Sequence, residues 1–78
     1  MRAKSLLRCL GEELRHRRTA LGISQELLAH QAGVHTNVVG RLERGMYNPT
    51  VLILSAIATQ LDTSLSKLFT SAEERHQS

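Results

Sequence analysis

The stretch that decides the fold reads SQELLAHQAGVHTNVVGRLERGMYNP and runs from residue 24 to residue 49. Its apolar positions 28, 29, 32, 34, 39 and 42 surround Gly33. Apolar residues three or four positions apart share one face of a helix, and a glycine after such a run commonly ends it. Two short helices that meet at a steep angle also need a small residue where they approach, which Ala29 supplies. The stretch therefore predicts one helix before Gly33 and a second from about 36 to 44.

The same helical spacing continues on both sides of this stretch. Upstream, leucines at positions 7, 10, 14 and 21 predict an amphipathic helix that ends at Gly22. Downstream, Thr50 and Ser64 can cap helix N-termini, so each predicts the start of a further helix. The inward positions of these two helices are Val51, Leu54, Ile57, Ala58, Leu61, Leu65, Leu68 and Phe69. No segment alternates as a strand does, and the sequence therefore predicts an all-α, compact five-helix bundle.

Length and composition indicate a single small domain over residues 1–78. Of the 78 residues 41% are apolar, with one Phe, one Tyr and no Trp, so aliphatic side chains must build the core. The longest apolar run, Val51 to Leu54, is far below the ~20 residues of a membrane span. Arg8 and Glu12 interrupt any apolar signal segment, which makes a cytoplasmic protein the expectation. Residues 72–78 are polar and are expected to fray.

The residues that could hold a metal or carry out catalysis are few and scattered. Cys9 is the single cysteine, so it can form neither an internal disulfide nor a thiolate zinc site. Histidines at positions 16, 30, 35 and 76 lack metal-ligand spacing, and Ser24 has no adjacent base. We therefore expect no metal, no cofactor and no enzyme activity, and a small apolar or surface role for Cys9.

Charge is concentrated in the first half of the chain. The formal net charge of +3 divides into +4 over residues 1–44 and −1 over residues 45–78. A one-sided basic surface on a small domain suggests a polyanionic partner, nucleic acid first. Solvated surface charge explains the same imbalance equally well, so charge alone does not decide the partner.

The spaced residues SQ..LA..AGV....V..LERG...P resemble the helix-turn-helix of the phage repressor and Cro-type family, also called the Xre family. The resemblance runs from about residue 10 to residue 69, and residues 1–9 extend the first helix beyond it. It implies a lambda-repressor-like domain that places its third helix in the major groove of double-stranded DNA. It also implies a partly buried ion pair between Arg18 and Glu43, which occupy the matching positions of the first and third helices.

Several side chains suit DNA contacts once the third helix is placed in the groove. Asn can pair with adenine, Arg with guanine, and a Thr methyl can pack on that of thymine. The expected base readers are Thr36, Asn37 and Arg41. Phosphates favour helix N-termini and side-chain donors around them. The expected backbone contacts are Ser24, Gln25, His35, Arg44 and Asn48, although His35 could equally be a plain cap. Gly40 on this helix either allows close approach to DNA or contacts nothing.

These features predict a sequence-specific DNA-binding transcriptional regulator that acts as a homodimer on two related half-sites. A bound dimer would block or recruit RNA polymerase. The expected dimer interface consists of Leu52, Ile53, Ala56, Leu65 and Phe69, because exposed apolar groups on the fourth helix indicate a partner surface. Local packing is the alternative role for this patch. An antitoxin-type module that masks a partner toxin, and also binds DNA, is the alternative function.

Overall fold

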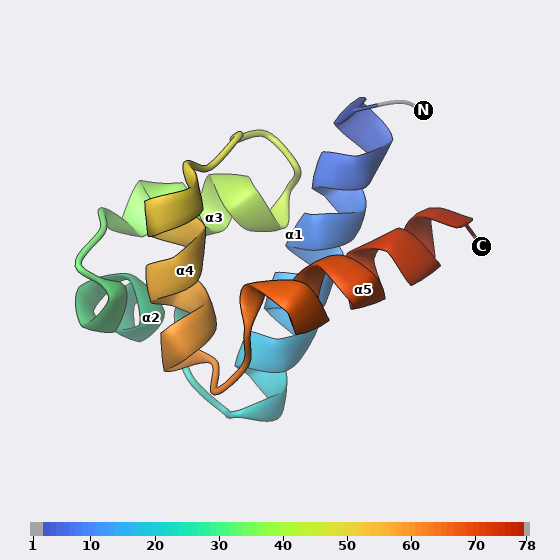
Figure 1. The fold of residues 1–78 in the computed structure, drawn as a ribbon. Helices are drawn as coiled ribbons and strands as arrows, with labels where there is room; N and C mark the ends of the chain where they lie inside the picture. Colours follow the sequence, from blue (N-terminus) through green and yellow to red (C-terminus); the bar gives the residue numbers. More distant parts are fainter. Residues whose placement is uncertain (1–2, 78) are drawn as a thin grey trace.

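The computed structural model describes residues 3–77 as five helices joined by short turns (Figure 1). The helices are α1 (Ala3–Ala20), α2 (Gln25–Ala32), α3 (Thr36–Glu43), α4 (Val51–Gln60) and α5 (Leu65–Gln77). The predicted all-α five-helix fold is therefore confirmed, and residues 3–9 are the first turns of α1. Residues 1, 2 and 78, which belong to the predicted extension and tail, lie outside the described residues.

The helices α2, α4 and α5 each begin at a hydroxyl side chain that caps free backbone N–H groups. The Ser24 Oγ accepts from the N–H of Leu27 at 3.0 Å, and the Thr50 Oγ1 accepts from that of Ile53 at 3.1 Å. At α5, Ser64 does the same for the N–H of Lys67 at 3.1 Å. The removal of one such cap typically costs about 1 kcal/mol, so these residues determine where the helices start.

The turns after α1, α2, α3 and α4 contain one left-handed residue each. Gly22, Gly33 and Gly45 have φ between 71° and 73°, and Asp62 has φ 56°. Glycine has no Cβ to clash in this conformation, and Asp tolerates it because its short polar side chain can bond locally. The turns are therefore specified by local residue type.

An aliphatic core fills the space between the helices, as composition predicted. Its most deeply buried side chains are Leu14, Leu28, Val39, Leu42, Ile57 and Leu68. Three residues that periodicity placed in this core are instead exposed: Leu21 by 50%, Val51 by 71% and Phe69 by 38%. Leu21 follows the last residue of α1 and Val51 is the first residue of α4, so both lie beyond the part of their helix that faces the core.

The described C-terminal residues are helical up to Gln77, whereas the sequence predicted a frayed tail over residues 72–78. The helix α5 continues to Gln77 and packs along α1 (Figure 1). Ala72 is fully buried in this contact, and Arg75 donates from Nε to the Glu13 carboxylate at 2.9 Å. The polar residues 73–77 therefore continue an amphipathic helix, in which His76 is half-buried and the other four residues are exposed.

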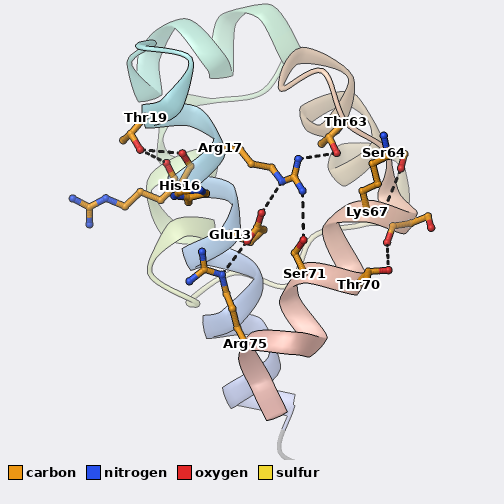
Figure 2. A network of polar contacts seen from close by, with 12 residues as sticks. Glu13, His16, Arg17, Thr19, Thr63, Ser64, Lys67, Thr70, Ser71 and Arg75 are labelled. Atoms are coloured by element: carbon orange, nitrogen blue, oxygen red, sulfur yellow. Dashed lines mark hydrogen bonds and ion pairs between the residues drawn. The ribbon is translucent and has the colours of Figure 1, made fainter. Parts of the chain in front are cut away.

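The Glu13 carboxylate lies at the centre of a polar network between α1 and α5 (Figure 2). Arg17 donates to it from Nε at 2.7 Å and also reaches Thr63 Oγ1 at 3.1 Å and Ser71 Oγ at 3.4 Å. Burial raises the pKa of Glu13, but the hydrogen bonds from Arg75 and Arg17 outweigh it, so the net pKa lies below its ordinary value.

Acid should therefore weaken this network. A carboxyl group with a lowered folded-state pKa stabilises the fold above its unfolded pKa, and this stabilisation is lost as pH falls through the folded value. We expect Glu13→Gln to cost about 1.5–3 kcal/mol at neutral pH. The difference from the wild type should shrink when urea melts are repeated well below pH 4.5, the ordinary value of a Glu. Glu12→Gln, at a 52% exposed side chain, is the matched control and should show little effect. A pH-independent difference would contradict the role of Glu13.

The crossing of α1 over α3 is unusually close. A Cβ atom built on Gly11 would overlap the carbonyl oxygen of Leu42 and would lie 2.8 Å from that of Glu43. Gly11 is buried, so only a residue without a side chain fits there.

In the part of the chain that the structure describes, no helix has both the length and the apolar character to cross a membrane.

Candidate nucleic-acid interface

The helices α2 and α3 pack together through the turn at Gly33. The N–H of Val34 donates to the Ala29 carbonyl oxygen at 3.0 Å, which closes the end of α2. On α3, Val39 and Leu42 are buried against the core. Because these apolar side chains fix the orientation of α3, its opposite face is turned toward solvent.

The three predicted base readers lie on this solvent-facing side. Asn37 and Arg41 are exposed and Thr36 is half-buried. A shallow hollow of about 330 Å³ lies beside them. It is lined by Gln25, Thr36, Asn37, Gly40, Arg41 and Arg44. The structure thus brings the three predicted readers together with two predicted backbone contacts, Gln25 and Arg44, beside the N-terminus of α2.

Three other predicted backbone contacts lie outside the hollow. Ser24 and His35 are exposed caps, and His35 Nδ1 accepts from the N–H of Asn37 at 3.1 Å. The capping role left open for His35 is therefore present. Asn48 is exposed in the loop after α3 and lines an apolar groove instead.

Gln25 has a structural role that the sequence did not predict. Its Nε2 donates to the Glu43 Oε1 at 2.9 Å, which ties the first residue of α2 to the last residue of α3. Substitutions of Gln25 therefore disturb the packing of α2 on α3 as well as any contact with a ligand.

The expected ion pair between Arg18 and Glu43 is present between α1 and α3. Arg18 Nε lies 2.6 Å from Glu43 Oε2 and Nη2 lies 3.0 Å from Oε1, so the pair is bidentate. The two side chains are 12% and 3% exposed. Arg18 also donates to the Ile23 carbonyl oxygen at 2.8 Å, and its hydrogen bonds to Glu43 raise the pKa of its guanidinium. The pair fixes α3, the helix that carries the predicted readers, against α1.

Gly40 does not lie at a free surface, contrary to the alternative that it contacts nothing. It is buried, and a Cβ atom built on it would lie 3.5 Å from the Gln25 Oε1 and 3.6 Å from an Arg44 nitrogen. These are ordinary van der Waals distances to flexible side chains. The fold therefore has room for a methyl group at this position.

The predicted interface residues differ in exposure. Leu52 is 82% exposed and Phe69 is 38% exposed. Ile53 and Leu65 are half-buried and pack against the core, and Ala56 is half-buried too. An apolar groove of about 170 Å³ extends this surface toward α1. Its lining residues are Leu6, Leu7, Leu10, Asn48, Pro49, Thr50, Val51, Leu54, Leu65 and Phe69.

Tyr47 contacts the predicted reader Arg41, and the sequence did not predict this contact. Its ring centroid lies 5.9 Å from the guanidinium carbon of Arg41. The sequence contains one indication of this contact: the single Tyr follows Gly45, the glycine that ends α3, by two residues.

Two short helices joined at a left-handed glycine, with a polar solvent-facing second helix, define the helix-turn-helix class of DNA-binding protein. Residues 14–68 match the helix-turn-helix family, and the chain therefore belongs to this family, as an Xre-type DNA-binding transcriptional regulator.

Two controller proteins and one further gene regulator are similar to this chain and support the assignment. The chain is 39% identical over 61 residues to the control protein C.SmaI of Serratia marcescens, a match that spans 78% of this chain and 73% of the relative. The restriction-modification controller protein C.AhdI of Aeromonas hydrophila is 40% identical, with a TM-score of 0.77 over 80% of this chain and 94% of its own. The clp gene regulator ClgR of Corynebacterium glutamicum is 25% identical, with a TM-score of 0.88 over 92% of this chain and 77% of its own. These relatives are gene regulators and control proteins and not enzymes.

Proposed function

We propose that this protein binds double-stranded DNA sequence-specifically, as a homodimer on two related half-sites, and regulates transcription by occupying them. The observation that carries the proposal is the solvent-facing side of α3. Thr36, Asn37 and Arg41 lie there around one hollow, beside the N-terminus of α2. A helix of this kind fits the major groove, where base edges differ in their donors and acceptors.

The roles of the three readers follow from their chemistry. Asn37 offers an amide that can bond both to the N6 and to the N7 of adenine, and Arg41 offers two N–H groups to guanine. Thr36, half-buried at the start of α3, offers a methyl group to thymine and a hydroxyl to a base edge. Together they would read adjacent base pairs within one half-site.

The residues around these readers suit the phosphate backbone. The N-terminus of α2 presents free N–H groups and a partial positive charge, and Gln25 adds an amide there. Arg44 is exposed on the same side of α3 and suits a phosphate as a charged donor. Ser24, His35 and Asn48 are exposed outside the hollow and complete the proposed backbone contacts.

Loss of a base reader should change which sequences are bound. A preferred site is first selected from random duplex DNA, and Asn37→Ala and Arg41→Ala are then titrated against it. Each should lose about 1–3 kcal/mol of binding free energy and relax the preference at one or two base pairs. Arg44→Ala should weaken all sequences alike and reduce the salt slope by about one.

Arg15→Ala is the matched charge control for Arg41→Ala. Arg15 is exposed on α1 and does not line the hollow, so its loss removes the same charge away from the proposed reading face. If Arg41→Ala left the selected motif intact and weakened random DNA equally, Arg41 would belong with the phosphate contacts. A wild-type protein that showed no preferred sequence at all would contradict the proposed function.

The proposal of a homodimer rests on selectivity and on the apolar surface of α4 and α5. One such domain reads too few base pairs to stand out among ~10⁶–10⁹ genomic sites, and two-fold symmetry doubles the contacts. The side chains assigned to the interface are Leu52, Ile53, Ala56, Leu65 and Phe69. Half-sites would then lie about 10–10.5 base pairs apart, or a multiple of that, so that both α3 helices face the same side of the duplex.

Leu52→Glu should abolish the dimer and leave the proposed base readers on α3 unchanged, because Leu52 lies on α4. Leu52 is the best position for this change, because its 82% exposed side chain contributes little to the monomer core. A buried, unpaired carboxylate in the interface is strongly unfavourable, so sedimentation should show a monomer. Binding to the two-half-site operator should become weak and non-cooperative.

Leu21→Glu provides the matched control, because Leu21 is a half-exposed leucine at the far end of α1. It should sediment and bind like the wild type. A Leu52→Glu protein that stayed dimeric would place the interface elsewhere, with the groove around Leu6 as the next position to test.

A further inference from the structure

The loop that follows α3 is turned back onto that helix at Arg41. The N–H of Met46 donates to the Arg41 carbonyl oxygen at 2.8 Å, and the N–H of Gly45 donates to the Leu42 carbonyl oxygen at 3.0 Å. This pattern is the Schellman motif, in which a left-handed residue, here Gly45 with φ 71°, ends the helix. The residues after Gly45 therefore lie beside the last turn of α3.

The side chain of Arg41 makes two contacts with the same loop. It donates from Nη2 to the Met46 carbonyl oxygen at 3.4 Å, and its guanidinium carbon lies 5.9 Å from the Tyr47 ring centroid. A guanidinium within about 6 Å of an aromatic ring is attracted to the negative face of that ring. Arg41 is exposed, whereas Tyr47 is half-buried and packs against the core. The ring thus offers an anchored surface to an otherwise mobile side chain.

We propose that Tyr47 is a positioning residue for Arg41 and thereby helps to determine which base pair the protein prefers. This inference rests on the proposed function, because it takes Arg41 to read a base edge. An arginine loses rotamer freedom when it binds a base, and a side chain already held in place loses less. The Met46 carbonyl engages only Nη2, so N–H groups on the rest of the guanidinium can still reach guanine.

The chemistry of the contact requires the face of the ring and not the hydroxyl group. No hydrogen bond joins the Tyr47 hydroxyl to the other described side chains. Tyr47→Phe should therefore preserve the contact with Arg41, whereas Tyr47→Leu fills similar space without an aromatic face. This pair of variants separates the role of the ring from that of the side chain's volume.

A first experiment tests the contact in the free protein, without DNA. The Arg41 side-chain protons should show a ring-current shift in NMR spectra of the wild type and of Tyr47→Phe. Tyr47→Leu should bring these resonances toward those of an unconstrained arginine. Resonances that are the same in all three proteins would overturn the proposed positioning, whatever the protein does with DNA.

A second experiment tests the consequence for DNA recognition. On the sequence selected by the wild type, Tyr47→Leu should bind about three- to tenfold more weakly, and Tyr47→Phe should bind almost as the wild type does. The Tyr47→Leu preference should relax at the same base pair that Arg41→Ala relaxes. Urea melts establish that each variant is folded under the binding conditions.

A double-mutant cycle isolates the coupling between the two residues. In the Arg41→Ala background, Tyr47→Leu should change neither affinity nor preference further. If the two effects add, or if Tyr47→Leu weakens preferred and random DNA equally, the inference is overturned while the proposed function stands. If Arg41→Ala itself leaves the preference unchanged, Arg41 reads no base, and both its proposed role and the inference about Tyr47 fail.

Discussion

Glu43→Ala should lower the free energy of unfolding by about 3–5 kcal/mol, because it leaves the largely buried guanidinium of Arg18 without its carboxylate partner. The Glu43 carboxylate accepts three hydrogen bonds, two from Arg18 and one from Gln25, and its side chain is 3% exposed. Its removal therefore affects α1, α2 and α3 together. Equilibrium urea melts measure this loss. The slope of the unfolding free energy against urea concentration should stay unchanged, because the variant loses stability and not compactness.

A matched control is Glu26→Ala, which removes an exposed carboxylate from α2. It should change stability by no more than about 0.5 kcal/mol, the usual range for a surface substitution. Arg18→Ala should also be destabilising, and the double variant should cost much less than the sum of the two single changes. A loss below about 1 kcal/mol for Glu43→Ala would mean that the pair behaves as exposed surface charges.

Gly11→Ala is the second substitution expected to have a large effect. The added methyl group would overlap the Leu42 carbonyl oxygen and approach that of Glu43 to 2.8 Å. Both atoms belong to the backbone of α3, so no side-chain rotation can relieve the clash. Overpacking of a core costs about 1–3 kcal/mol and occasionally more, and we expect this change at or above the upper end.

Gly40→Ala makes the same chemical change on a helix where there is room for it. Its Cβ would lie at 3.5 Å and 3.6 Å from flexible side chains, so the better helix propensity of alanine should stabilise the protein by about 0.5–1 kcal/mol. The opposite signs of the two variants in thermal or urea melts test the packing directly. If Gly11→Ala were neutral, α1 and α3 could not be as close as they are in the structure.

Local rules predicted where the helices begin and end. Thr50 and Ser64 cap helices as expected, and α2 ends at Gly33 as expected, where the backbone is left-handed. These capping and turn signals depend on residues within one helical turn of each other, so the sequence alone is enough to predict them. The same holds for the aliphatic core of the helix-turn-helix.

The errors arose where distant segments meet. Periodicity cannot show where a helix passes beyond the core, so it placed Val51 inside although that residue is 71% exposed. Residues 72–78 were expected to fray because they are polar, but Arg75 bonds to Glu13, 62 positions away. Gly11 carried no local signal at all, because its importance comes from the backbone of α3.

The sequence predicted most of the residues that line the hollow of the candidate site. Several of them lie on α3 three or four positions apart, and residues at this spacing share one face of a helix. It did not predict that Gln25 bonds to Glu43, because that contact joins two helices. It also did not predict that Tyr47 would face Arg41, since this depends on the direction in which the chain leaves α3. The DNA-binding roles of these residues stay predictions.

The packing of α1 against α5 forms late in translation, because α5 is synthesised after α1. Glu13 is synthesised early, and its partner Arg75 is synthesised 62 residues later. At ~5–20 residues per second, α1 waits roughly 3–12 seconds for the helix that covers it. Until α5 is made, α1 lacks the apolar cover that the buried side chains of Leu68 and Ala72 belong to. The bundle that supports the helix-turn-helix is thus completed by α5, which packs on α1 and α4 and is synthesised after them.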